Sequence, residues 1–152
     1  RTCKLIMSLL IFLPILVIIL IDQLIKYAAV LYLKPVGGIS FINGFLDFVY
    51  VENKGAAFGI LKDQRWFFIA VSSIFLIAFL FFILYKKINS KLFSLAAVFL
   101  VGGGISNMID RIFLGHVIDY IQLSFFKPVC NFADYCIVIG AVFLSIYLLK
   151  LK

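Results

Sequence analysis

The chain has few residues that could hold a metal ion or form cross-links. It contains one histidine, His116, and three cysteines, Cys3, Cys130 and Cys136, among 152 residues. A zinc hydrolase typically uses three protein ligands and a bis-histidine haem uses two, so we expect no metal and no other cofactor. The odd cysteine count argues against a full disulfide framework. Cys130 and Cys136 stay open as a pair, although Cys136 falls in the last apolar segment.

Other common catalytic signatures are also missing. The sequence has no Gly-x-Ser-x-Gly elbow, and Ser106 has no evident base. No soluble segment combines aromatic and basic residues as a nucleic-acid surface does, so we expect no nucleic-acid partner despite a net charge of +7. The remaining candidate catalytic groups are carboxylates.

Charged residues are scarce, and long apolar runs dominate. Hydrophobic residues make up 65% of the chain, 18 residues are Phe, and the mean hydropathy is +1.20. Soluble domains are about 45–50% apolar, so this composition predicts an integral membrane protein. The segments long enough to cross the hydrocarbon are about 5–33, 66–85, 92–109 and 133–149. We expect helices, because an open strand cannot satisfy its backbone in lipid.

The N-terminal segment has an alternative interpretation as a cleavable signal peptide, since Arg1 and Lys4 precede the apolar stretch. The stretch 5–21 is longer than a usual signal-peptide core, and no A-x-A-like site follows a short core. We therefore expect a retained helix.

Basic residues indicate the orientation. Four crossings place both termini on the side of the second loop. That side carries seven bases and no acid: Arg1, Lys4, Lys86, Lys87, Lys91, Lys150 and Lys152. These bases crowd the segment ends in short loops, which favours cytoplasmic termini and attraction to anionic membrane lipid. The acids then face outward.

Both outer loops are partly apolar. Loop 34–65 has turn signals at Gly37-Gly38 and Asn43-Gly44, with β-branched and aromatic runs at 39–42 and 45–51. We expect a small β-sheet there, and an interfacial loop or helix over about 111–132. The predicted fold class is a membrane all-α core of four transmembrane helices with a small extracytoplasmic β-sheet, in one domain spanning 1–152.

Asp119 and Asp134 bracket the third loop, and neither has an adjacent base. Two carboxylates close together cannot both ionise cheaply, so one can act as an acid while the other acts as a base on water. The alternative is that each caps a helix or meets a surface base. Asp110 stands beside Arg111, and we expect these two to form a scaffold ion pair.

Five polar blocks occur in order along the chain. They are Asp22-Gln23-Leu24-Ile25-Lys26, Asn53-Lys54-Gly55-Ala56-Ala57-Phe58-Gly59, Gly104-Ile105-Ser106-Asn107-Met108-Ile109-Asp110-Arg111, Val117-Ile118-Asp119-Tyr120 and Asn131-Phe132-Ala133-Asp134. Together they resemble the D-x-x-x-K, N-x-G-A-A-[FW]-G, G-x-x-N-x-x-D-R, V-V-D-F and F-N-x-A-D blocks of the lipoprotein signal peptidases (signal peptidase II), a family of membrane aspartyl proteases. Cys130 stands where the family usually has Phe, which concerns substrate fit and not the reaction.

The resemblance implies a role for each matching residue. Asp119 and Asp134 become the catalytic dyad. The supporting positions are Asp22, Lys26, Asn53, Gly55, Gly104, Asn107, Asp110, Arg111, Asn131 and Ala133. Asp22 and Lys26, at i and i+4, can pair while Lys26 snorkels outward.

The implied activity is removal of signal peptides from diacylglyceryl-modified prolipoproteins, on the N-terminal side of the lipidated cysteine. We expect a monomer in the bacterial cytoplasmic membrane, with its active site toward the outer face and sensitive to globomycin. The alternatives are a small four-helix transporter, which would place an ionisable residue near mid-bilayer, and a non-enzymatic membrane subunit.

Overall fold

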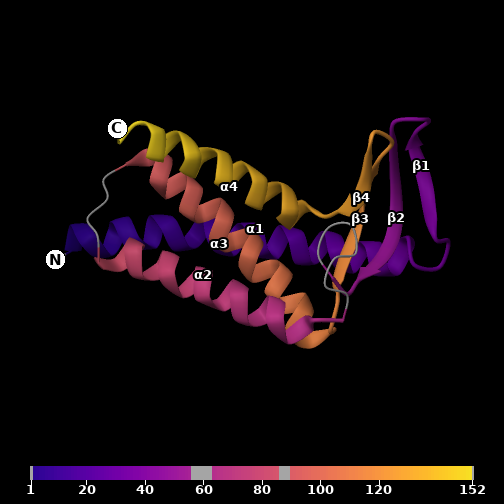
Figure 1. The fold of residues 1–152 in the computed structure, drawn as a ribbon, viewed down its shortest axis with the longest axis horizontal. Coiled ribbons are helices and arrows are strands. Elements are labelled where there is room, and N and C mark those ends of the chain that lie inside the picture. Colours follow the sequence, from indigo (N-terminus) through magenta and orange to yellow (C-terminus); the bar gives the residue numbers. More distant parts are fainter. Residues whose placement is uncertain (1, 56–62, 86–89, 152) are drawn as a thin grey trace.

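The computed structural model describes residues 2–55, 63–85 and 90–151. Its elements follow the order α1 (Thr2–Tyr32), β1 (Gly38–Ile42), β2 (Leu46–Asn53), α2 (Arg65–Tyr85), α3 (Lys91–Phe113), β3 (Val117–Leu123), β4 (Phe126–Cys130) and α4 (Phe132–Leu149). The helices run along the long axis of the molecule, and the strands lie together at one end (Figure 1). The start of α1 and the end of α4 lie at the opposite end. Ala56-Ala57-Phe58-Gly59 of the second block falls outside the described residues.

All four helices have the length and composition of membrane spans. The spans are Ile11–Tyr32, Arg65–Phe82, Lys91–Phe113 and Phe132–Leu149. Large apolar side chains point away from the protein, with Leu24 66% exposed and Phe75 68% exposed. Such extensive apolar exposure suits lipid and not water. The predicted four-helix membrane core is therefore confirmed.

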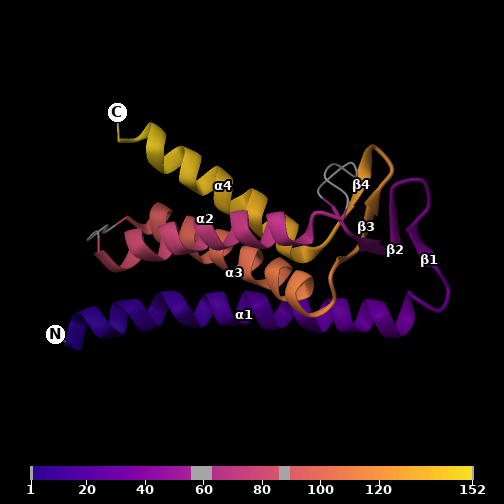
Figure 2. The same ribbon diagram turned by 60° about the horizontal axis from the view of Figure 1, so that its bottom comes forward.

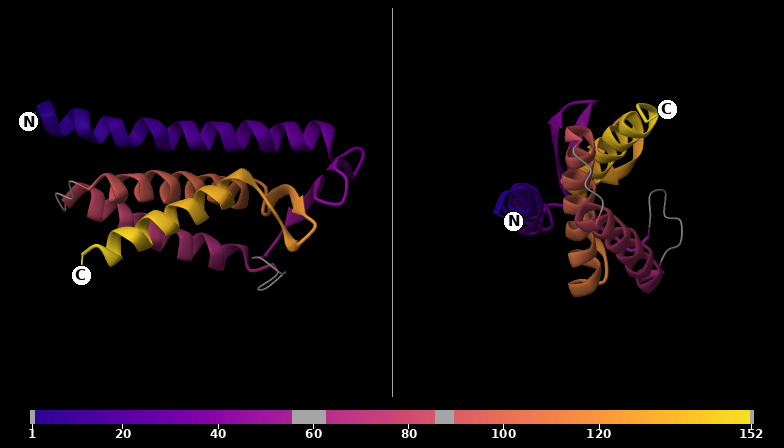
Figure 3. Two further views of the ribbon diagram at one scale, coloured as in Figure 1. Left: turned by 90° about the horizontal axis from the view of Figure 1, so that it is seen from above. Right: turned by 90° about the vertical axis from the view of Figure 1, so that its left-hand side faces the viewer.

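α3 is the central helix and packs against α1, α2 and α4 (Figures 2 and 3). Small residues allow α4 to approach closely: a Cβ added at Gly103 would lie 2.5 Å from the carbonyl oxygen of Ala133, and one at Gly140 would lie 2.8 Å from the backbone N of Leu100. α3 and α4 therefore touch backbone to backbone at two levels.

α1 presents one buried stripe to the rest of the protein. The stripe follows helical spacing and consists of Ile15, Ile18, Asp22, Lys26, Ala29 and Leu33. Two charged residues thus lie in the middle of an otherwise apolar face. Such residues inside a membrane span mark a candidate functional site.

The sheet is antiparallel with strand order β1-β2-β3-β4. Its presence confirms the predicted small sheet, but the expectation of an interfacial loop or helix over 111–132 is wrong. α3 continues to Phe113, and the rest of that segment forms β3 and β4. The physical reason is that β3 pairs the free edge of β2, while Ile118 and Tyr120 pack against Ala29 and Leu33 of α1.

Candidate active site

The register between β2 and β3 places Asn53 beside Asp119. Val51 lies opposite Asp119, and a β-bulge between Phe48 and Val51 adds one residue to β2. Asn53, two residues beyond Val51, therefore shares the sheet face of Asp119. Without the bulge Asn53 would point to the opposite face. Asn53 Nδ2 donates to Asp119 Oδ2 at 2.7 Å, and the Asn53 Oδ1 accepts from the Gly55 backbone N at 2.9 Å.

Asp134 is held by the first turn of α4. Asn131 is the N-cap: its Oδ1 accepts from Asp134 N at 2.9 Å, while Asp134 Oδ2 accepts from Asn131 N at 3.1 Å. This reciprocal capping box satisfies two backbone donors at the start of the helix. Asn131 Nδ2 also donates to Asp119 Oδ1 at 2.6 Å. One residue therefore binds both aspartates.

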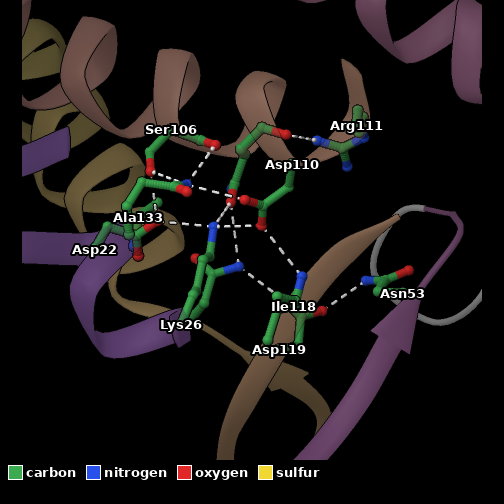
Figure 4. A network of polar contacts seen from close by, with 12 residues as sticks. Asp22, Lys26, Asn53, Ser106, Asp110, Arg111, Ile118, Asp119 and Ala133 are labelled. Carbon is green, nitrogen blue, oxygen red and sulfur yellow. Dashed lines mark hydrogen bonds and ion pairs between the residues drawn. The ribbon is translucent and has the colours of Figure 1, made fainter. Parts of the chain in front are cut away.

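Asn107 on α3 connects Asp134 to a buried ion-pair network. Its Nδ2 donates to Asp134 Oδ1 at 2.8 Å, and its Oδ1 accepts from Lys26 Nζ at 2.8 Å. Lys26 Nζ also pairs with Asp22 Oδ2 at 2.7 Å and with Asp110 Oδ2 at 2.8 Å (Figure 4). The ammonium thus has three oxygen partners, enough to satisfy its three donors.

Two details of the predicted network are wrong. Lys26 pairs with Asp22 as expected but does not snorkel outward; its side chain is only 1% exposed, because three oxygen partners lie within reach inside the protein. Asp110 pairs with Lys26 and not with Arg111. Adjacent residues on a helix do not face each other, so the side chains of Asp110 and Arg111 diverge.

Arg111 reaches the other side of the site. Its guanidinium donates to the Asn107 carbonyl at 3.3 Å and to the Gly55 carbonyl at 3.5 Å. It also lies 5.0 Å from the ring centre of Phe68 on α2. Arg111 therefore links α2, α3 and the segment after β2 beside the aspartates.

A cavity of about 470 Å³ opens against this group. Its polar wall consists of Asn53, Gly55, Asn107, Arg111 and Asp134, and its apolar wall comes from the β3–β4 hairpin and α4. The cavity therefore combines hydrogen-bonding groups with an apolar surface, as small-molecule and peptide sites usually do.

Cys130 lies in the apolar wall and is a free thiol, as is the buried Cys136. The disulfide between these two cysteines, which the sequence left undecided, is therefore not formed. Burial, together with the negative charges of Asp134 and Asp119, raises the pKa of the Cys130 thiol to about 11. The thiol therefore stays protonated at neutral pH.

A second, almost wholly apolar cavity of about 430 Å³ lies between α2, α3 and α4. Gly104, a predicted supporting residue, lines this cavity beside Leu76 and is not part of the polar group. Ile137 of α4 borders both cavities. The two cavities therefore lie on either side of the same part of α4.

The sequence analysis gave no supporting role to two polar residues of the network, Ser106 and Gln23. Ser106 Oγ donates to Asp22 Oδ2 at 2.6 Å, and Gln23 Nε2 donates to Ser106 Oγ at 3.0 Å and to Asp110 Oδ1 at 2.9 Å. Both are polar residues inside membrane spans, which is the signal that would have found them. Ala133 N donates to Asp22 Oδ1 at 2.9 Å and joins α4 to the same network.

The environment of Asp119 favours its protonated form. Burial is the largest cause and the negative charge of Asp134 the second, and together they raise the pKa of Asp119 to about 7. The hydrogen bonds from Asn53 and Asn131 act in the opposite direction. Within the described part of the chain, no three His, Cys, Asp or Glu residues gather in a way that could hold a metal ion.

Comparison with known proteins identifies relatives of nearly full length. The signal peptidase (SPase) II family model matches residues 14–150. The lipoprotein signal peptidase of Caldanaerobacter subterraneus subsp. tengcongensis is 39% identical over 135 residues, 89% of this chain and 92% of the relative. That of Clostridioides difficile is 39% identical over 140 residues, 89% of this chain and 93% of the relative.

The fold agrees with a solved bacterial membrane enzyme, determined by the in meso method. The two superpose with a TM-score of 0.85 at 31% sequence identity, over 92% of this chain and 87% of that one. A second such structure gives a TM-score of 0.82, also at 31% identity, over 92% of both chains. With these matches in sequence and fold, the chain belongs to the signal peptidase II family, proteases that remove signal peptides from prolipoproteins.

Proposed function

We propose that Asp119 and Asp134 form the catalytic dyad of an aspartyl endopeptidase. The observation that supports this most is that both carboxylates bind Asn131, one through its side-chain amide and the other through its backbone N–H. A strand and a helix thus bring a buried acid, Asp119, and a half-buried acid, Asp134, to one polar group. Asn107 and Asp134 line the adjoining cavity, where a peptide bond would lie.

The proposed reaction needs one proton shared between two carboxylates. The ionised aspartate removes a proton from water, and the water oxygen attacks the peptide carbonyl. The protonated aspartate assists by donating to the carbonyl oxygen, and the roles reverse when the tetrahedral intermediate collapses and the amine leaves. The dyad titrates as a unit, so neither residue is assigned as the resting base.

The proposed substrate is a prolipoprotein whose cysteine carries a diacylglyceryl group, cleaved on the N-terminal side of that cysteine. The apolar cavity between α2, α3 and α4 supports this choice, because acyl chains could occupy it while the scissile bond lies at the dyad. We place the protein as a monomer in the cytoplasmic membrane, with cytoplasmic termini and the sheet end facing outward. The basic residues at the ends of the spans support this orientation.

Cleavage by the purified protein tests the proposal directly. The protein in detergent micelles should cleave a diacylglyceryl-modified prolipoprotein at the lipidated cysteine, as read by mass spectrometry of the products. It should leave the same precursor without the lipid largely uncut, and globomycin should block the reaction. Cleavage at another bond, or equal cleavage of the unlipidated precursor, would contradict the proposed substrate.

Cleavage should also depend on pH through the proton that the two aspartates share. Because burial and Asp134 raise the pKa of Asp119 to about 7, the dyad keeps its shared proton below that pH and loses it above. We expect kcat to fall about tenfold per pH unit above about pH 7.

The change Asn53→Ala gives the matching control for this pH dependence. It removes a donor that stabilises the charged form of Asp119, so the alkaline limb should move to higher pH. Steady-state cleavage measured between about pH 5 and pH 9 would check both expectations. An alkaline limb at the same pH in both proteins would show that Asp119 does not set it.

A further inference from the structure

Lys26 contacts neither aspartate of the proposed dyad, so it has no direct part in the proposed reaction. Its ammonium is buried on α1 and contacts Asp22, Asp110 and Asn107. Of these three partners, only Asn107 also hydrogen-bonds a carboxylate of the proposed dyad. Asp22 and Asp110 instead accept from the backbone N–H groups of Ala133 and Ile118, which neighbour the dyad in the sequence. Asn107 is therefore the most direct side-chain connection between Lys26 and a dyad carboxylate.

The side-chain amide of Asn107 has two unlike ends, and its orientation matters. Its Oδ1 lies 2.8 Å from the Lys26 ammonium and 3.2 Å from Asn131 Nδ2, while its Nδ2 lies 2.8 Å from Asp134 Oδ1. A flipped amide would place N–H groups against the ammonium and an oxygen against the carboxylate. The charge on Lys26 therefore favours one orientation, in which Asp134 receives a donor.

The same anchor extends to the second carboxylate. Asn131 Nδ2 donates both to Asn107 Oδ1 at 3.2 Å and to Asp119 Oδ1 at 2.6 Å. The amide oxygen that Lys26 holds is thus also an acceptor that fixes the amide bound to Asp119. Asn107 Nδ2 thus donates to Asp134, and Asn131 Nδ2 donates to Asp119.

We infer that Lys26 is a positioning residue that acts on the dyad through the Asn107 amide, and not only an ion-pair partner that stabilises the spans. The inference depends on the proposed dyad. Without the ammonium, the Asn107 oxygen keeps only the longer contact from Asn131, which Asp119 shares. The amide then rotates more freely, and Asp134 loses a directed donor.

A double-mutant cycle between Lys26 and Asn107 tests the inference. Lys26→Met alone would leave two buried carboxylates uncompensated and could prevent folding. The variant Lys26→Met/Asp22→Asn keeps the net charge of the group and leaves one carboxylate without the ammonium, Asp110, which retains hydrogen bonds from Gln23 and from the Ile118 backbone N. This variant is compared with Asp22→Asn alone. Relative to that reference we expect kcat to fall at least about 10-fold, with KM for the lipidated precursor nearly unchanged.

Adding Asn107→Ala distinguishes positioning from a general structural role. If Lys26 acts through this amide, Asn107→Ala should lower kcat strongly in the Asp22→Asn protein but by less than about threefold once Lys26 is absent. Gln23→Met is the matched control, since Gln23 lies on the same helix and binds Ser106 and Asp110. In the Gln23→Met protein, Asn107→Ala should keep its full effect.

Two results would overturn the inference while leaving the proposed function standing. One is that the wild-type protein cleaves but Asn107→Ala lowers kcat equally with and without Lys26. The other is that Gln23→Met removes the effect of Asn107→Ala as completely as loss of Lys26 does. Failure of the wild-type protein to cleave would instead contradict the proposed function itself.

Discussion

Replacing either Asp119 or Asp134 with asparagine should lower kcat for the lipidated precursor by about 1,000-fold or more, because neither amide can exchange a proton with water or with the leaving amine. The substitutions keep side-chain size, so insertion and folding should persist. Because the two residues act as a unit, the double variant should be no slower than the slower single variant. Product formation over long incubations, with a thermal-unfolding measurement on each protein, would check this.

Asp47→Asn is the matched control for this experiment. Asp47 lies on β2 opposite Gln122, away from the polar network around Asn131. Asp47 is half-buried, and its buried Oδ1 has no hydrogen-bond partner that the substitution would remove. The same chemical change there should therefore leave kcat within about twofold of the wild-type value. Wild-type turnover in either dyad variant would show that the assignment is wrong.

Gly103→Ala should have the second largest effect, although Gly103 touches neither aspartate. Its added Cβ would lie 2.5 Å from the carbonyl oxygen of Ala133, which is backbone and cannot rotate away. The start of α4 must shift, and Asp134 moves with it relative to Asn107. We expect kcat to fall about 10- to 100-fold and the free energy of unfolding to fall by about 1–3 kcal/mol.

Gly104→Ala isolates this steric cause. The residue is next on the same helix, but its added Cβ would meet only Leu76 Cδ2, at an ordinary contact distance of 3.5 Å. The melting temperature of the Gly104→Ala protein should therefore match that of the wild-type protein. Equal melting temperatures for Gly103→Ala and the wild-type protein would mean that α3 and α4 can separate without cost, against the packing described above.

The membrane spans could be predicted from sequence because hydropathy reports a single physical quantity, the cost of leaving water. The β3–β4 hairpin could not, since its apolar residues suit an interfacial helix as well as a strand. What decides between them is the unpaired edge of β2, which lies more than sixty residues earlier in the sequence. Local pattern does not carry that information.

In the candidate site, too, some features could be predicted from the sequence and others could not. The resemblance to a family indicated which residues gather, and the dyad stays a prediction until it is tested. How they gather depends on details that spacing does not encode. The bulge in β2 turns Asn53 toward Asp119, and the ion pair of Asp110 goes to a helix far away in the sequence and not to its neighbour Arg111.

The capping box at Asn131 and Asp134 has a consequence for how the protein matures. The two residues that begin the last span are the same two that complete the polar group around Asp119. A nascent chain whose final helix is not yet packed against α3 would lack both the start of that helix and half of the proposed dyad. Membrane insertion and the onset of proteolysis would then be one event, and an incompletely assembled protease would have no activity to release.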